Sequence, residues 1–361
     1  LAQRVSRIQP LPEADELAPA DASALRLTAR RTWRQFETHV TAADNHLPPD
    51  NVQEDPPAVA HRTSPTNIGL YLLSTACARD LGWIGAGEAL ERVEATLATL
   101  QRMARHRGHF LNWYDTRDLR ALEPQYVSTV DSGNLAGCLL ALARGCRAWR
   151  DEPLPLASRW AGVADAIDLA REEVAPLCAP AVAEHQTWRR LDLALRGLSD
   201  ALRGGQEEPD ARAALEAVLR EWAGLAEPLR GLLAEREDAT ELAYWLSAAE
   251  AGLRSHLRDF EFPEFDRRLG AAEAVARRLA LEMDYGFLLD QDRKLLSIGY
   301  RVAEGALDAN CYDLLASEAR LARFLASARG GVPARHWFRL GHAVTLTPEG
   351  AALISWSGSM F

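Results

Sequence analysis

The amino-acid sequence predicts an all-α fold in which consecutive helical hairpins form a solenoid or a closed toroid. Three observations support this class. Apolar residues recur every three or four positions through most of the chain, helix start and stop signals separate these stretches, and strand-like patterns are confined to residues 294–302 and 343–356. The sequence has no repeat of fixed period, which weakens the solenoid alternative.

The first part of the chain contains three predicted helices. Residues 63–65 supply an N-cap and a first-turn proline for a buried helix that ends at Asp80. The second helix covers residues 87–107, and Gly108 terminates it; its apolar stripe comprises Leu90, Val93, Leu97, Leu100 and Met103. The third covers residues 133–149, with Asp131 or Ser132 as its N-cap and an apolar stripe of Leu135, Leu139, Leu142 and Cys146.

The rest of the chain continues the helical pattern. Residues 155–284 are rich in Ala, Leu, Glu and Arg and predict four or five amphipathic helices. Residues 308–330 predict one more. Between and after these helices, residues 294–302 predict a short strand, and residues 343–347 and 351–356 predict a hairpin around Pro348 and Gly350.

Composition and charge exclude several functions. With 41 Lys and Arg against 51 Asp and Glu, the net charge of −10 gives no general attraction to nucleic acid. Apolar runs such as residues 68–73 are far shorter than the roughly 18 to 20 residues of a bilayer span, so we expect no membrane insertion of this segment. His106 and His109 have no acidic partner nearby, and nucleotide or serine-hydrolase motifs are missing, so we predict neither metal nor cofactor.

Four segments combine Gly, Asn, Asp, Trp and Tyr at predicted helix entrances: residues 48–70, 108–135, 287–319 and 335–360. Carboxylates and amides beside an aromatic ring suit recognition of a sugar, which presents hydroxyls and an apolar C–H face. The candidate sugar contacts are Arg62, Asn67, Trp113, Asp115, Asp131, Asn134, Trp337, Arg339 and Trp356. Simple N-capping by Asp131, core packing of the tryptophans and scaffold roles for Arg62, Asn67 and Arg339 are the alternatives.

Glu318 is the candidate catalytic residue. Helical spacing places it on one stripe with Leu314, Leu321 and Leu325, where the pattern calls for an aliphatic side chain. Burial would raise its pKa, as a general acid near neutral pH requires. The alternative is a buried ion pair with one of the many arginines.

Seven strings closely resemble bacterial cyclic β-1,2-glucan synthases, in the order found in that family. They are LPPDN at 47–51, RTSPTNIGLY at 62–71, GHFLNWYDT at 108–116, VDSGNL at 130–135, YDLLASEARLA at 312–322, HWFRLG at 336–341 and SWSGSMF at 355–361. Residues 150–260 contribute little to the resemblance.

The resemblance implies a region between a membrane-embedded glucosyltransferase and a phosphorylase-like domain, on the cytoplasmic side of the inner membrane. Its expected fold is an (α/α)6 toroid, and its expected reaction is an anomer-retaining transglycosylation that cuts linear β-1,2-glucan and closes it into a ring. Carried over by motif, Glu318 is the acid/base, and Asp313 and Ser357 join the candidate glucan contacts.

In the family the chain continues beyond the SWSGSMF string, and the partner carboxylate lies in that continuation. We therefore expect residues 1–361 to be the N-terminal two thirds of one toroid domain, with residues 1–30 as a lead-in, and to be inactive alone. An inverting endo-β-1,2-glucanase and a non-catalytic glucan-binding or spacer module are the alternative functions.

Overall fold

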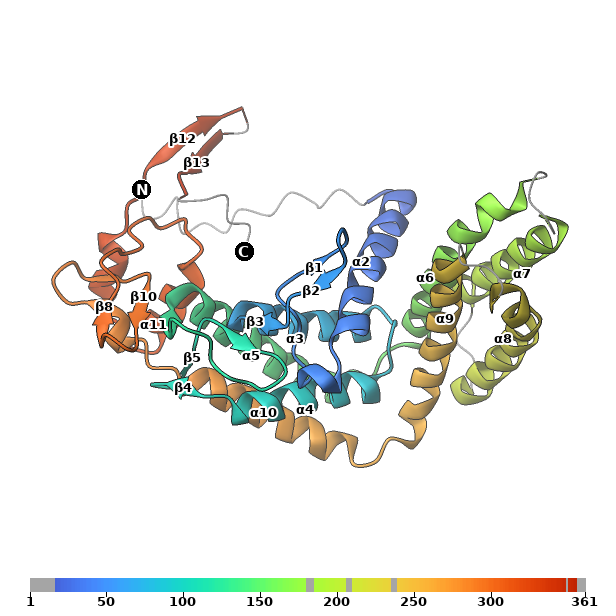
Figure 1. The fold of residues 1–361 in the computed structure, drawn as a ribbon, viewed down its shortest axis with the longest axis horizontal. Coiled ribbons are helices and arrows are strands. Elements are labelled where there is room, and N and C mark those ends of the chain that lie inside the picture. Colours follow the sequence, from blue (N-terminus) through green and yellow to red (C-terminus); the bar gives the residue numbers. More distant parts are fainter. Residues whose placement is uncertain (1–16, 180–184, 206–209, 235–238, 349, 356–361) are drawn as a thin grey trace.

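The computed structural model describes residues 17–179, 185–205, 210–234, 239–348 and 350–355. Within these ranges the chain is mainly helical (Figure 1). The α-helices are α2 (Pro19–His39), α3 (Pro65–Asp80), α4 (Ala86–Arg102), α5 (Thr129–Asp151), α6 (Leu156–Val174), α7 (His185–Arg203), α8 (Ala211–Ala234), α9 (Thr240–Arg258), α10 (Phe265–Leu281) and α11 (Arg320–Ala328). Helices α3 and α5, α5 and α10, and α6 and α7 pack in contact, which confirms the all-α class of helical hairpins.

The strands are short and pair antiparallel. Two of them fall in residues 294–302 and two form the predicted C-terminal hairpin, but sequence patterns missed the others. The described strands are β1 (Val52–Gln53), β2 (Ala58–Val59), β3 (Arg62–Thr63), β4 (Arg105–His106), β5 (His109–Phe110), β6 (Tyr114–Asp115), β7 (Tyr126–Ser128), β8 (Leu289–Asp290), β9 (Leu295–Leu296), β10 (Gly299–Arg301), β11 (Ala306–Leu307), β12 (Val344–Thr347) and β13 (Gly350–Leu353).

Three helix boundaries differ from the sequence-based predictions. Helix α4 ends at Arg102, because residues 105–110 form the β4–β5 hairpin and Gly108, with φ of 83°, occupies its turn. Helix α5 begins at Thr129, and its N-cap is Ser128, whose hydroxyl accepts from the Asp131 backbone N–H. Helix α11 begins only at Arg320, because the preceding segment forms isolated bridges from Cys311 to Ser297 and from Leu314 to Gly341 instead.

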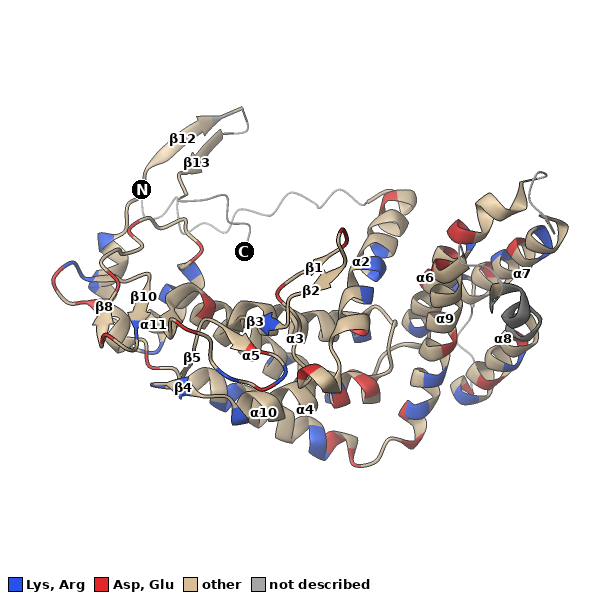
Figure 2. Cartoon of the chain, viewed as in Figure 1, with Lys and Arg blue, Asp and Glu red and all other residues tan. Residues whose placement is uncertain are grey.

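Other predicted elements are confirmed. Helix α3 has the predicted bounds, and the Ser64 hydroxyl accepts the backbone N–H of Asn67 at 3.2 Å. Residues 155–284 contain α6 to α10, and β12 and β13 form the predicted hairpin. In Figure 2, acidic and basic residues intermix along the helices. Among the described helices, none combines the length and apolar character that a bilayer span requires.

The buried apolar side chains fall into two clusters. One involves α3, α4, α5, α10 and the neighbouring strands, and the other lies between α6, α7, α8 and α9. Figure 1 shows these two helix groups beside each other along the long axis, and α2 contacts both α3 and α6. That residues 1–361 belong to one domain stays a prediction.

A strand pairing and a helix contact carry distant segments to the start of α5. Strand β10 pairs with β7, with Gly299 opposite Ser128, and the Thr129 N–H donates to the Ile298 carbonyl at 3.0 Å. Helix α11 then packs against the first turn of α5 at Gly133, where a Cβ atom would lie 2.5 Å from the backbone nitrogen of Ala322. Glycine at this position therefore permits the close approach of the two helices.

Candidate active site

The candidate site begins where α3 and α5 start beside each other. The hydroxyl of Thr66, in the first turn of α3, donates to Asp131 Oδ1 at 2.6 Å, and its backbone N–H lies 3.4 Å from the same oxygen. Asn134 Nδ2 donates to the Thr66 hydroxyl at 3.2 Å. The first-turn N–H groups of both helices favour a carboxylate at this place. Asp131 is therefore half-buried and held by another helix, and it is not the N-cap that the sequence suggested.

The loop before β6 completes the surroundings of Asp131. With the Asn112 amide oriented to satisfy both of its neighbours, its nitrogen donates to Asp131 Oδ2 at 3.1 Å and its oxygen accepts from Trp113 Nε1 at 3.0 Å. The Asn112 backbone N–H donates to the Tyr126 carbonyl at 2.7 Å, which fixes this loop on β7. Both carboxylate oxygens of Asp131 thus accept hydrogen bonds from residues far away in sequence.

A second carboxylate, Asp50, is linked to Trp113 through Arg62. Arg62 donates to Asp50 Oδ2 from Nε at 3.1 Å and from Nη2 at 2.9 Å, and Asn67 Nδ2 lies 3.4 Å from Asp50 Oδ1. The Arg62 guanidinium carbon lies 4.8 Å from the centroid of the half-buried Trp113 ring. We call this set the entrance cluster: Asp50, Arg62, Thr66, Asn67, Asn112, Trp113, Asp131 and Asn134.

Glu318 lies close to this cluster, but on a turn and not on the helix that the sequence predicted. It is half-buried in the turn before α11, so it shares no helical stripe with Leu314. Burial raises the pKa of the Tyr312 phenol to about 12, and the negative charges of Glu318 and Asp131 add to that rise. The two carboxylates therefore both lie near Tyr312. Within the described part of the chain, Glu318 forms no ion pair with an arginine, so the ion-pair alternative gains no support there.

Other predicted site residues lie away from the entrance cluster or already bond to neighbouring backbone groups. Asp115 faces Arg62 in the β3–β6 register, but its Oδ1 accepts the Arg117 backbone N–H at 2.8 Å and so stabilises its own turn. Asp313 is exposed. Burial lowers the pKa of Arg323 to about 10, and the negative charge of Asp313 opposes this decrease.

The last candidates lie on or after the short helix η6 (Ala334–Arg339). Trp337 and Arg339 are exposed there, and no described contact joins them to the entrance cluster. Trp356 and Ser357 lie outside the described residues. The structure thus unites Arg62, Asn67, Trp113, Asp131 and Asn134, with Glu318 near them.

The sequence reasoning did not single out Asp50, Thr66, Asn112 or Tyr312 as site residues. All four occur in the strings that carry the family resemblance, and this was the available signal. Half-buried carboxylates, amides, a guanidinium and an indole at one surface can bind hydroxyl groups and stack on a sugar ring. Among the described residues, no group of three or more His, Cys, Asp and Glu is placed to hold a metal ion.

Comparison with known proteins shows which proteins this chain resembles. No protein-family profile matches the chain. The chain is 42% identical over 355 residues to the cyclic beta-(1,2)-glucan synthase NdvB of Rhizobium meliloti (strain 1021). This match covers 93% of the chain but 12% of that protein, so the chain corresponds to a small part of the relative's length. The resemblance to cyclic β-1,2-glucan synthases is thereby confirmed.

Two solved structures are also similar. A glucoamylase-like protein of Bacteroides caccae has a TM-score of 0.48 and 12% identity, over 94% of this chain and 57% of that chain. A glucoamylase-like protein of Bacteroides fragilis has a TM-score of 0.29 and 15% identity, over 54% of this chain and 37% of that chain.

Proposed function

We propose that this chain forms part of an anomer-retaining transglycosylase that cleaves linear β-1,2-glucan and closes it into a cyclic product. The observation that carries the proposal is the position of two carboxylates, Asp131 and Glu318, near Tyr312 beside the entrance cluster. The 42% identity to a cyclic beta-(1,2)-glucan synthase supports the choice of substrate.

In the proposed reaction Glu318 is the acid/base. A second carboxylate attacks the anomeric carbon while Glu318 gives its proton to the leaving glycosidic oxygen, which forms a covalent glycosyl-enzyme. Glu318 then takes the proton of a hydroxyl at the other end of the same glucan. That oxygen displaces the enzyme carboxylate and closes the ring, and the anomeric configuration is retained.

The entrance cluster supplies binding in this proposal. Asp131 is held by Thr66 and Asn112 and can accept a hydrogen bond from a sugar hydroxyl through its remaining lone pairs. Trp113 offers its half-buried indole ring to the C–H face of a glucosyl ring.

The attacking carboxylate is expected in a part of the synthase that follows residue 361. In the longer protein, the glucosyltransferase and phosphorylase-like domains of the family would be partners, with a membrane anchor outside this segment.

The test is Glu318→Gln in the full-length protein, assayed on linear β-1,2-glucan with products separated by mass. Loss of the transferable proton should lower turnover by about 10² to 10⁴-fold, while glucan affinity is kept. The matched control is Glu304→Gln, an exposed acidic residue that pairs with Arg301, and it should retain full activity. Normal turnover of Glu318→Gln would refute the catalytic role.

The anomeric outcome separates this function from the hydrolytic alternative. A retaining transglycosylase has carboxylates about 5 Å apart and yields rings when a hydroxyl of the same chain attacks the glycosyl-enzyme, whereas an inverting glucanase separates them by about 6.5 to 9.5 Å and yields shortened chains. Residues 1–361 alone should give neither product. Rings made by this segment alone would show that a complete carboxylate pair lies within residues 1–361. Asp115, Asp131 and Asp313 would then be the partners to test, Asp131 first, because its charge and that of Glu318 both act on Tyr312.

A further inference from the structure

A separate groove runs between α2, α4 and α9, away from the entrance cluster. Two adjoining cavities of about 260 and 630 Å³ make up this groove, and Glu88, Arg92 and Ala251 line both. The larger volume falls within the roughly 300 to 1,000 Å³ of typical ligand sites. None of the lining residues belongs to the entrance cluster, so the groove is a distinct candidate site.

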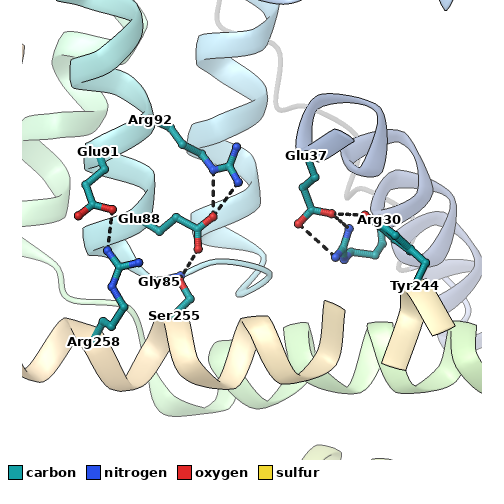
Figure 3. A network of polar contacts seen from close by, with 9 residues as sticks. All are labelled: Arg30, Glu37, Gly85, Glu88, Glu91, Arg92, Tyr244, Ser255 and Arg258. Carbon is teal, nitrogen blue, oxygen red and sulfur yellow. Dashed lines mark hydrogen bonds and ion pairs between the residues drawn. The ribbon is translucent and has the colours of Figure 1, made fainter. Parts of the chain in front are cut away.

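The centre of the groove is a fixed polar network (Figure 3). Glu88 Oε1 accepts from Arg92 Nε at 3.0 Å and from Nη2 at 2.8 Å, while Oε2 accepts from the Ser255 hydroxyl at 2.6 Å. Ser255 in turn accepts the Gly85 backbone N–H at 2.8 Å. Glu88 and Arg92 remain 22% and 23% exposed, so oriented acceptors and donors face the groove.

Both ends of the groove repeat this arrangement. At one end the Tyr244 hydroxyl donates to Glu37 Oε2 at 2.6 Å, and Glu37 also pairs with Arg30 at 2.8 Å (Figure 3). At the other end Arg258 pairs with Glu91 at 2.6 Å. Each carboxylate is thus held in place by a partner, and its remaining lone pairs are available to a ligand.

The charge balance of the lining selects a class of ligand. The lining acids Glu37, Glu88 and Glu91 are matched in number by Arg92, Arg254 and Arg258. A site for a metal cation or a phosphate would carry an excess of one sign. The smaller cavity adds an apolar surface from Trp83, Ile84, Ala248 and Gly252.

We propose that this groove binds a neutral oligosaccharide. A hydroxyl group can donate to a carboxylate and accept from a guanidinium at once, so paired Glu and Arg side chains suit a row of hydroxyls. The apolar surface suits the C–H faces of the sugar rings. The choice of linear β-1,2-glucan as the ligand rests on the proposed function; the groove would then retain a chain whose other part occupies the entrance cluster.

The experiment measures binding of linear β-1,2-glucan to the 361-residue chain by calorimetry. Ala251→Trp places a large side chain where both cavities meet, and it should weaken groove binding at least tenfold. The matched control is Ala274→Trp, an exposed alanine on α10, which should bind as the wild type does. Thermal unfolding followed by circular dichroism establishes that both variants fold.

A second variant, Asp131→Asn, separates the two proposals. If Ala251→Trp binds normally while Asp131→Asn loses binding, the groove proposal fails and the entrance cluster stands. If only Ala251→Trp loses binding, the groove stands and the entrance cluster fails as a glucan site. Absence of saturable glucan binding to the wild type overturns the groove proposal. Binding of inorganic phosphate or Mg²⁺ that Ala251→Trp abolishes overturns it as well. The proposed reaction is tested separately by Glu318→Gln.

Discussion

The entrance cluster and the α6–α9 helix group use charged side chains in different ways. In the helix group, Asp165 is fully buried and accepts Arg26 Nη2 at 2.6 Å, Arg203 Nη2 at 3.0 Å and Trp83 Nε1 at 2.9 Å. In the entrance cluster, Asp131 is held by neutral hydroxyl and amide donors at a half-buried surface. A fully buried acid whose oxygens are all occupied by protein donors stabilises the fold, whereas a half-buried acid with open lone pairs keeps capacity for a ligand.

Removal of Asp165 should have the largest effect on stability. Asp165→Ala leaves the buried Trp83 N–H unpaired and two part-exposed arginines without their partner, so we expect a loss of about 3 kcal/mol in the free energy of unfolding. Denaturant titration measures this loss. Asp200→Ala, which removes an exposed carboxylate near Arg196, should cost less than about 0.5 kcal/mol. Equal losses of stability in the two variants would show that Asp165 does not stabilise the fold more than an exposed acid does.

Acid should destabilise both helix groups through one buried histidine in each. His109 donates from Nε2 to the Asp284 carbonyl at 2.7 Å, His256 donates to the Gly82 carbonyl at 2.8 Å, and burial lowers the pKa of each to about 4. Because both pKa values lie below the ordinary 6.5, the neutral rings contribute stability that is complete above pH 6.5 and is lost as the pH falls toward 4. By pH 5 the loss is about 2 kcal/mol for each histidine.

Unfolding titrations from pH 7 to pH 5 measure this dependence. His109→Gln and His256→Gln should each flatten the pH profile by a similar amount, although one residue lies beside α5 and the other on α9. The exposed His342→Gln variant should follow the wild-type slope. A slope that persists in the double variant would mean that other groups carry the acid sensitivity.

Truncation of Trp113 should change binding more than stability. Trp113→Ala removes the ring that packs on Arg62, and we expect about a tenfold weaker affinity for linear β-1,2-glucan, or about 1.4 kcal/mol. Trp113→Phe keeps an aromatic face and should recover part of the affinity. A Trp113→Ala variant with wild-type affinity and a large loss of stability would place this residue with the scaffold, as in the helix group.

Local signals in the sequence predicted much of the fold. Helix α3 follows from a serine cap, a proline and a continuous apolar run, and all three act within a few residues. Helix α11 was predicted too early, because residues 308–319 satisfy their backbone groups by bridges to Ser297 and Gly341 instead of helical bonds. Such pairings depend on segments brought together by the fold and leave no local periodicity.

The site was predictable by residue type but not by partner. Sequence patterns selected Asp131, Trp113 and Arg62 as sugar contacts, and the structure brings them together. The bond between Thr66 and Asp131 joins residues 65 positions apart, and β10 pairs with β7 across a longer separation. A single sequence does not reveal which distant residues come into contact. For this reason Asp131 was predicted as an N-cap, and Tyr312 was not recognised as a site residue.

The most direct test of the account is a crystal structure of this chain with a linear β-1,2-glucooligosaccharide. We predict glucosyl density at the entrance cluster, with a sugar hydroxyl within hydrogen-bond distance of Asp131 and a C–H face against Trp113. Glucan bound only in the groove between α2, α4 and α9 would contradict this prediction. An empty entrance cluster in a crystal grown with saturating oligosaccharide would contradict it too.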